Sequence, residues 1–289
     1  MSLQQQPARP SAGAERVRRP ITVLAHPGGR YPGVELPPNW FQGPGEGPTI
    51  PSALPAPGDA AGILNGVIQM CTALRDRTAA SLAAGEHPTL IGGDHSMAMG
   101  SIAAAAAHHG RMAVIWVDAH ADFNTMESSP TGNPHGMPLA VSCGVGDPRL
   151  TAMYKSFVSP QDVVLIAARD IDPGERALLV QYGIWCVTVE QLRELGVETL
   201  VKGIVYRFRG VPVHLSFDFD AISSEYFSAT GTPVPEGLMP DEACELLAAL
   251  AASPLAIGSS DWVEFDPRHE QAAEAAELAR RLYRSFHGS

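Results

Sequence analysis

Two short segments of this sequence place acidic and imidazole side chains at every second position. Asp118, His120 and Asp122 alternate with alanines in DAHAD, and Asp218 and Asp220 flank a phenylalanine in DFD. Each segment follows an apolar run, and in an extended chain every second side chain points the same way. Carboxylates gathered on one side repel each other strongly in a partly dry cleft unless protons or metal ions offset their charge. The spacing therefore indicates a site for cations.

A third segment, GGDHS from Gly92 to Ser96, adds a second histidine. Two neutral imidazoles with four carboxylates suit Mn²⁺ best and leave Co²⁺, Ni²⁺, Fe²⁺ or Zn²⁺ as alternatives. Two divalent cations offset four carboxylates, and a water held between them acquires a lower pKa and is directed at an electrophilic carbon. Metal-assisted hydrolysis is the predicted reaction class. The predicted metal ligands are His95, Asp118, His120, Asp122, Asp218 and Asp220.

Each segment taken alone has a plainer interpretation. DAHAD is compatible with a solvated turn or a helix cap, and GGDHS with a turn in which Asp94 or Ser96 caps the next helix. DFD is compatible with a Ca²⁺-binding or merely solvated loop. Because all three segments follow apolar runs in one chain, the metal centre is the favoured interpretation.

Those apolar runs are short, rich in Val and Ile, and alternate with helical patterns, which is typical of βα units and a parallel sheet. Strands are predicted at Ile21–Ala25, Pro88–Ile91, Met112–Val117, Val163–Ala167, Ile184–Val187, Val211–Phe217 and Leu255–Val263. Helices are predicted at Ala60–Ala84, Ala98–His109, Gly174–Tyr182, Val189–Arg207, Pro240–Ala252 and His269–Phe286. The carboxyl ends of parallel strands face a common crevice, so the polar segments should converge there.

The alternation is continuous, which predicts one domain over residues 21–289 behind a disordered tail at residues 1–20. The tail has four arginines and no apolar stretch, so a secretory signal is excluded and an Arg-rich transit peptide is a minor alternative. Residues 26–57 are dense in Pro and Gly and also contain aromatic residues, which predicts an ordered surface loop.

Composition limits the partners of the chain. A net charge of −11 argues against nucleic acid, and no apolar run approaches the roughly 18 residues of a spanning helix, which argues against a membrane role. The four cysteines have no paired spacing and lie among apolar neighbours. Buried thiols in a reducing compartment are expected, and hence a cytoplasmic protein.

The three segments, together with a late VEFDP, resemble in this order the motifs of the arginase or ureohydrolase family. The resemblance covers roughly residues 85–270. It implies a three-layer α/β/α sandwich with a mainly parallel, roughly eight-stranded sheet and a binuclear manganese centre. One metal would be held by His95, Asp118, Asp122 and Asp218, and the other by His120, Asp118, Asp218 and Asp220.

The resemblance also assigns catalytic roles. Glu264 would grip the substrate guanidinium through bidentate N–H acceptors, although the following Phe-Asp-Pro departs from the usual Val-Asn-Pro. His135 would deliver a proton to the leaving amine, and Asp122 would accept a hydrogen bond from the attacking hydroxide. The plainer alternatives are an exposed or capping acid for Glu264 and an ordinary loop histidine for His135.

A further set of residues resembles the family's contacts with the α-amino acid head of arginine. The carboxylate side would be Asn124, Thr131 and Asn133, and the ammonium side Asp172 supported by Glu175, with Thr232 lining the site. Asp172 and Glu175 also have the spacing of a capping box at a helix start, and Thr232 that of a turn residue.

The expected function is hydrolysis of L-arginine to L-ornithine and urea by a homo-oligomer, a trimer or hexamer in similar proteins. Departures leave the substrate open: GVELPPNWF replaces the usual N-terminal motif, and Ile222-Ser223-Ser224 replaces the usual Leu-Asp-Pro. The alternatives are agmatine, 4-guanidinobutyrate or N-hydroxyarginine as substrate, and formiminoglutamate hydrolysis. A different class is a metal-binding relative without catalysis, which retention of every ligand and of His135 disfavours.

Overall fold

The apolar runs form the centre of the fold. The computed structural model describes residues 23–25 and 60–288, and within them seven strands make one fully parallel sheet in the order β1-β2-β7-β6-β3-β4-β5. The strands are β1 (Val23–Ala25), β2 (Thr89–Ile91), β3 (Ala113–Val117), β4 (Val163–Ile166), β5 (Trp185–Val187), β6 (Pro212–Asp218) and β7 (Ala256–Val263). β6 and β7 lie between β2 and β3, so the strand order departs from chain order at the centre of the sheet.

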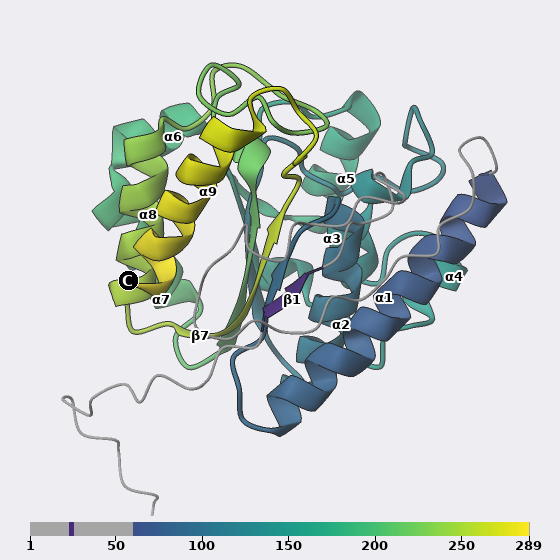
Figure 1. Cartoon of the computed structure of the whole chain (residues 1–289). Coiled ribbons are helices and arrows are strands. Elements are labelled where there is room, and N and C mark those ends of the chain that lie inside the picture. Colours follow the sequence, from purple (N-terminus) through teal and green to yellow (C-terminus); the bar gives the residue numbers. More distant parts are fainter. Residues whose placement is uncertain (1–22, 26–59, 289) are drawn as a thin grey trace, which may run out of the picture.

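Helices cover both faces of the sheet, which gives three layers (Figure 1). One face carries α1 (Ala60–Ala83), α2 (Ala98–His109), α3 (Pro138–Ser142), α4 (Pro148–Thr151) and α5 (Pro173–Tyr182). The other carries α6 (Val189–Leu195), α7 (Val197–Arg207), α8 (Pro240–Ala252) and α9 (Ala272–His287). No helix in the described residues is long and apolar enough to cross a bilayer.

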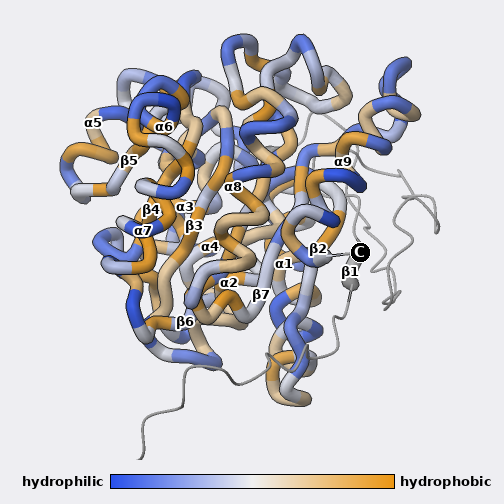
Figure 2. The backbone as a smooth tube through the Cα atoms, turned by 90° about the vertical axis from the view of Figure 1, so that its left-hand side faces the viewer, coloured by the Kyte–Doolittle hydropathy of each residue, from blue (hydrophilic) through white to orange (hydrophobic). Residues whose placement is uncertain are grey.

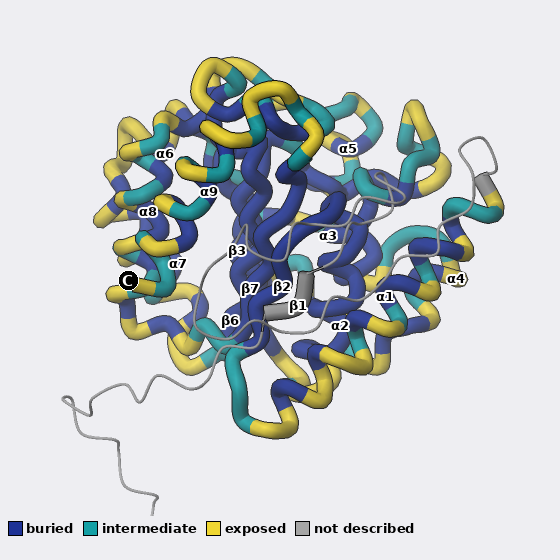
Figure 3. The backbone as a smooth tube through the Cα atoms, in the orientation of Figure 1, coloured by how far each residue is buried: buried dark blue, intermediate teal, exposed yellow. Residues whose placement is uncertain are grey.

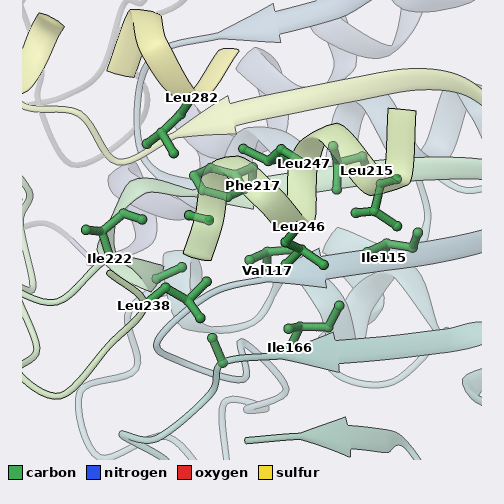
Figure 4. Close-up of a cluster of buried hydrophobic side chains, with 14 of the residues drawn as sticks. Ile115, Val117, Ile166, Leu215, Phe217, Ile222, Leu238, Leu246, Leu247 and Leu282 are labelled. Atoms are coloured by element: carbon green, nitrogen blue, oxygen red, sulfur yellow. The ribbon is translucent and has the colours of Figure 1, made fainter. Parts of the chain in front are cut away.

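Side-chain alternation along the strands divides the core into two clusters. In β3, Ile115 and Val117 pack toward α7, α8 and α9, whereas Val114 and Trp116 pack toward α1 and α2. Figure 4 shows the first cluster, where Leu215, Phe217 and the α8 leucines meet. A strand apolar on both faces must be covered on both faces, and Figure 3 shows these strands buried between layers whose outer surfaces are exposed. In Figure 2 hydrophobic residues follow the interior and hydrophilic ones gather on the outer turns.

The predicted α/β/α class and parallel sheet are confirmed, and each predicted strand is present with its ends shifted slightly. Seven strands lie in the described residues, one fewer than the rough expectation. The single helix predicted at Val189–Arg207 is wrong, because Gly196 (φ 75°) separates α6 from α7. The expectations for residues 1–20 and 26–57 fall outside the described residues.

All four cysteines are free, as predicted. Only Cys71 is fully buried, and its Sγ donates to the carbonyl oxygen of Ser96 at 3.1 Å. Cys143, Cys186 and Cys244 are partly buried.

Candidate metal centre

The predicted ligands converge at one edge of the sheet, at the carboxyl ends of β2, β6 and β3, with β7 between β2 and β6. His95 follows β2, Asp118, His120 and Asp122 follow β3, and Asp218 ends β6. Asp220 lies in the short 3₁₀ turn Phe219–Ala221 immediately afterwards. This is the crevice expected from a parallel sheet, at the point where its strand order changes.

The local geometry differs from the extended chain that the alternation suggested. β3 ends at Val117, and Asp122 has a positive φ of 48°, a region that non-glycine residues seldom occupy. Asp218 Oδ1 accepts a hydrogen bond from the backbone N–H of Asp220 at 2.7 Å, so this pair also lies in a turn. The ligands meet because the chain turns after each strand, and the interpretation of a shared strand face is wrong.

Both ring nitrogens and the ring face of His95 contact neighbouring side chains. Its Nδ1 lies 3.0 Å from Asp118 Oδ2, 3.3 Å from Asp122 Oδ2 and 3.1 Å from Asp218 Oδ2. Its Nε2 is 2.8 Å from Ser216 Oγ, and its ring stacks on Trp116 with centroids 4.0 Å apart. If Nε2 carries the proton and donates to Ser216, Nδ1 presents its lone pair to the three carboxylates.

The turn that carries His95 also begins with a cap, as the plainer interpretation of GGDHS expected. Asp94 Oδ1 accepts from the backbone N–H of Ser96 at 3.1 Å and from its hydroxyl. The capping role and the ligand role therefore belong to neighbouring residues and do not exclude each other.

His120 forms the second half of the cluster. Its Nδ1 lies 3.1 Å from Asp220 Oδ2 and 3.5 Å from Asp118 Oδ1. Two groups of side chains can each hold a cation, His95 with Asp118 and Asp122, and Asp118 with His120 and Asp220. Asp118 belongs to both groups, as a bridging ligand would. Asp218 approaches His95 but belongs to neither compact group, so its predicted bridging role stays a prediction.

The cluster concentrates more negative charge than buried side chains tolerate. Burial, with the charge of Asp118 nearby, raises the pKa of Asp122 well above its ordinary value. Burial and the neighbouring Asp220 do the same to the pKa of Asp218. Burial also opposes ionisation of Asp118, but the adjacent imidazoles of His120 and His95 outweigh it and hold the pKa of Asp118 well below its usual range.

These observations fit divalent cations. The buried His95 Nδ1 has no hydrogen-bond partner in the described structure, although three carboxylates surround it. Spacings near 3 Å between a nitrogen and several carboxylate oxygens are about those of adjacent ligands on one small cation. Cations bound between these atoms would both use the free nitrogen and offset the repulsion of the carboxylates.

Glu264 and His135 lie beside the cluster. Glu264 follows β7 directly with a positive φ of 65° and is 2% exposed. Its Oε1 accepts from the backbone N–H of His95 at 3.0 Å. His135 Nδ1 is 3.9 Å from the same oxygen. Glu264 is therefore not the exposed acid of the plainer interpretation, and His135 is not an isolated loop residue.

The predicted head-group residues Asn124 and Asp172 are in contact. Asn124 Nδ2 donates to Asp172 Oδ2 at 3.0 Å. Glu175 Oε1 accepts from the backbone N–H of Phe123 at 2.8 Å, and burial raises the pKa of Glu175 to about 7 against the opposing effect of that bond. Asp172 is the N-cap residue of α5, as a helix start there expects, but its side chain forms no cap bond. The capping-box alternative is wrong, and both side chains reach across to the loop after β3.

Of the other predicted substrate-binding residues, Thr232 contacts the cluster, whereas Thr131 and Asn133 do not. Thr232 Oγ1 lies 3.3 Å from Asp220 Oδ2, which puts Thr232 at the wall of the cluster. Thr131 is exposed, and its Oγ1 accepts from the backbone N–H of Asn133 at 3.2 Å. Within the described residues, the hydrogen bonds of Thr131 and Asn133 stay inside their loop.

Arg169 is a residue that the sequence reasoning missed. Its guanidinium donates to the carbonyl oxygens of Ala167, Asp220, Ala221, Ile222, Val234 and Pro235. Five of these oxygens belong to the turn after β6 and to the segment that carries Thr232, whereas Ala167 directly follows β4. A Cβ at Gly237 would lie 2.5 Å from Arg169 Nη2, so position 237 must be glycine for the Arg169 side chain to fit beside it. The only sequence signal was an arginine beside the acids of ARDIDPGE.

A parallel α/β sheet that gathers two histidines and four carboxylates at its carboxyl edge defines a metal-dependent hydrolase. The model of the Arginase family matches residues 55–288. The chain belongs to this family.

Known relatives agree with the fold and with the family. Arginase from Bacillus caldovelox is 38% identical over 71% of this chain and 69% of its own length, and arginase from Staphylococcus aureus (strain COL) is 36% identical over 77% and 74%. The crystal structure of Bacillus subtilis arginase superposes with a TM-score of 0.86 at 30% identity, covering 94% of this chain and 99% of that one. Entamoeba histolytica arginase in complex with L-ornithine gives 0.82 at 28% identity, over 93% and 98%.

Proposed function

We propose that this chain hydrolyses the guanidinium group of L-arginine, with water, to L-ornithine and urea at a centre of two Mn²⁺ ions. One observation carries the proposal: two histidine Nδ1 atoms face four carboxylates at the strand ends, with Asp118 common to both groups. The relatives named arginase, one of them solved with L-ornithine, support the same reaction.

The metal assignment follows from the donor atoms. Two imidazoles among carboxylates suit Mn²⁺, with Co²⁺, Ni²⁺, Fe²⁺ or Zn²⁺ as alternatives. The proposed ligands are His95, Asp118, His120, Asp122, Asp218 and Asp220. When bound, the cations supply the acidity that makes water a nucleophile near neutral pH.

The side chains of the chain supply the other parts of the reaction. Glu264, fixed by the His95 N–H, accepts hydrogen bonds from the guanidinium and orients its carbon toward the nucleophile. Asp122 accepts a hydrogen bond from the attacking oxygen and thereby fixes its direction. His135, next to Glu264, gives a proton to the departing δ-nitrogen as the C–N bond breaks, so that ornithine leaves as an amine and urea remains.

The choice of arginine over other guanidino compounds depends on the loop after β3. Asn124 is 5% exposed and touches Asp172, so an amide N–H donor and a carboxylate acceptor lie side by side. These are the groups that an α-carboxylate and an α-ammonium require. Thr131 and Asn133 would add donors for the carboxylate, Glu175 would support Asp172, and Thr232 would line the wall.

Other guanidino substrates are the second candidate. The contact between Asn124 and Asp172 disfavours agmatine and 4-guanidinobutyrate, because neither has both an α-carboxylate and an α-ammonium. Urea release after Mn²⁺ loading should be measured on L-arginine, agmatine, 4-guanidinobutyrate and N-hydroxyarginine side by side. We expect L-arginine to be preferred, and a preference for agmatine would refute the head-group assignment.

We also propose a cellular location and an oligomeric state for the enzyme. Four free cysteines suit a reducing compartment, which supports a cytoplasmic location. Assembly into a trimer or hexamer stays a prediction from the resemblance.

A further inference from the structure

Ser128 lies in the loop between Asn124 and Thr131 and has no role assigned to it by the resemblance, yet it bonds to a residue of the proposed head-group site. Its Oγ donates to Asn124 Oδ1 at 2.8 Å and accepts from the backbone N–H of Thr125, also at 2.8 Å. One hydroxyl thus serves as donor and acceptor at once. Asn124 lies on one side of it and a backbone amide of the same loop on the other.

The hydrogen bonds around Asn124 all run in one direction. The Thr125 N–H donates to Ser128, the Ser128 hydroxyl donates to the amide oxygen of Asn124, and the amide nitrogen donates to the Asp172 carboxylate at 3.0 Å. Because an ionised carboxylate only accepts, the nitrogen end of Asn124 must face Asp172. The Ser128 hydroxyl has one proton, and Asn124 Oδ1 is the acceptor that it reaches. The chemistry of the partners fixes both ends of the amide.

A flipped amide would lose the bond to Asp172. It would place a carbonyl oxygen against the Asp172 carboxylate, and the Ser128 hydroxyl proton would face an N–H₂ group that cannot accept it. In the observed orientation, one N–H of Asn124 is taken by Asp172 and the other stays beside it. That second N–H is the donor that a substrate carboxylate would need.

The surroundings hold Ser128 in place. A Cβ at Gly174, in the first turn of α5, would lie 3.2 Å from Ser128 Cβ and 3.3 Å from its carbonyl oxygen, so the loop packs closely on α5. The backbone N–H of Ser128 donates to Thr125 Oγ1 at 3.3 Å, and the N–H of Asn124 donates to the Gly136 carbonyl at 3.1 Å. Asn124 is therefore tied to the segment of His135 as well as to α5.

We propose that Ser128 is a positioning residue that sets substrate specificity: by locking the amide orientation of Asn124, it prepares the site for the α-amino acid head of the substrate. This inference rests on the proposed function. Preorganisation of this kind improves binding of the group that needs the donor and leaves substrates without that group unaffected.

The test is Ser128→Ala, with steady-state urea release measured on L-arginine and on agmatine at equal Mn²⁺ loading. We expect the KM for L-arginine to rise about fivefold at constant kcat, while kcat/KM for agmatine stays unchanged. Inhibition by L-ornithine should weaken by about the same factor, and inhibition by 1,4-diaminobutane, which lacks the carboxylate, should not change. Ser159→Ala is the matched control. The Ser159 hydroxyl also donates over 2.8 Å to a side-chain amide oxygen, that of Gln161, but this pair lies just before β4 and outside the substrate loop.

The outcomes separate the two proposals. No urea from L-arginine with the wild-type protein overturns both the proposed function and the role of Ser128. An active wild type with a Ser128→Ala variant that keeps the arginine-to-agmatine ratio overturns the role of Ser128 alone. An equal loss on both substrates, or a loss of bound Mn²⁺, also overturns it, because general damage to the loop would then explain the effect.

Discussion

The backbone N–H of His95 donates to Glu264 Oε1 over 3.0 Å, which joins the first and the last motif of the site across 169 residues. β2 and β7 are neighbours in the sheet, so the two residues meet directly beyond the strand ends. The same contact holds a proposed metal ligand and the proposed guanidinium acceptor at a fixed separation. The separation of these two residues therefore depends on the pairing of β2 with β7.

Replacing Glu264 by Gln should abolish most activity without loss of metal. The amide oxygen can still accept from His95, but the negative charge facing the guanidinium is lost and one acceptor becomes a donor. We expect kcat/KM for L-arginine to fall at least about 100-fold, roughly 3 kcal/mol of transition-state stabilisation. Asp266→Asn, which alters an acid paired with Arg268 on the same segment, should retain activity. Near-normal turnover by Glu264→Gln would refute the assigned role.

Replacing Arg169 by Met should loosen the turn that carries Asp220. Six carbonyl oxygens would lose a charged donor. We expect the free energy of unfolding to fall by about 2–4 kcal/mol, and Mn²⁺ bound per chain to fall below the wild-type content. Arg207→Met is the control, because Arg207 donates to the Gln161 carbonyl and is exposed. Full metal content and wild-type stability in Arg169→Met would contradict this account.

Glu175 should give folding stability a distinct pH dependence. Burial raises its pKa from 4.5 to about 7, with Asp172 and Asp118 adding to the effect and His120 opposing it. The folded state thus holds the proton more tightly than the unfolded chain, so this stabilisation is full below pH 4.5 and is lost as the pH rises to about 7. Urea denaturation of wild type and Glu175→Gln from pH 4.5 to 7.5 should show a difference that shrinks at low pH. A constant difference would be evidence against the raised pKa.

A buried pair in the core should contribute to stability away from the reaction. His214 Nε2 lies 2.9 Å from Asp261 Oδ2, both residues are fully buried, and Ser101 and Ser259 bond to the pair. Asp261→Ala would leave the other polar groups without their partner, and we expect a loss of about 3–5 kcal/mol in the free energy of unfolding. Adding His214→Ala should cost less than its separate effect, because the pair is already broken. Additive losses would show that the two residues act independently.

The sequence predicted the layers and the ligand set because both follow from local patterns. Apolar runs such as Val114–Val117 identify buried strands, and polar residues at their ends identify the crevice. The helix break at Gly196 was not predicted, because the apolar periodicity continues on both sides of it. The short helices α3 and α4 also escaped prediction, because four or five residues contain too little periodicity.

Several features of the site could not be predicted from the sequence, because they leave no regular pattern of residue types. The positive φ angles at Asp122 and Glu264 have no local signature in a non-glycine residue. Arg169 bonds to backbone oxygens, and Ser128 bonds to a side chain four residues away in an irregular loop, so neither contact leaves a spacing pattern. Asp172 and Glu175 had the spacing of a capping box, and only the tertiary contact with Asn124 and Phe123 showed another use.

Urea release from L-arginine by the purified, Mn²⁺-loaded chain, with bound Mn²⁺ counted in the same sample, tests the central claim most directly. The account predicts two Mn²⁺ per chain, a higher kcat/KM on L-arginine than on agmatine or 4-guanidinobutyrate, and L-ornithine formed in a one-to-one ratio with urea. A chain that binds Mn²⁺ at both positions and releases no urea from any of these compounds would contradict it.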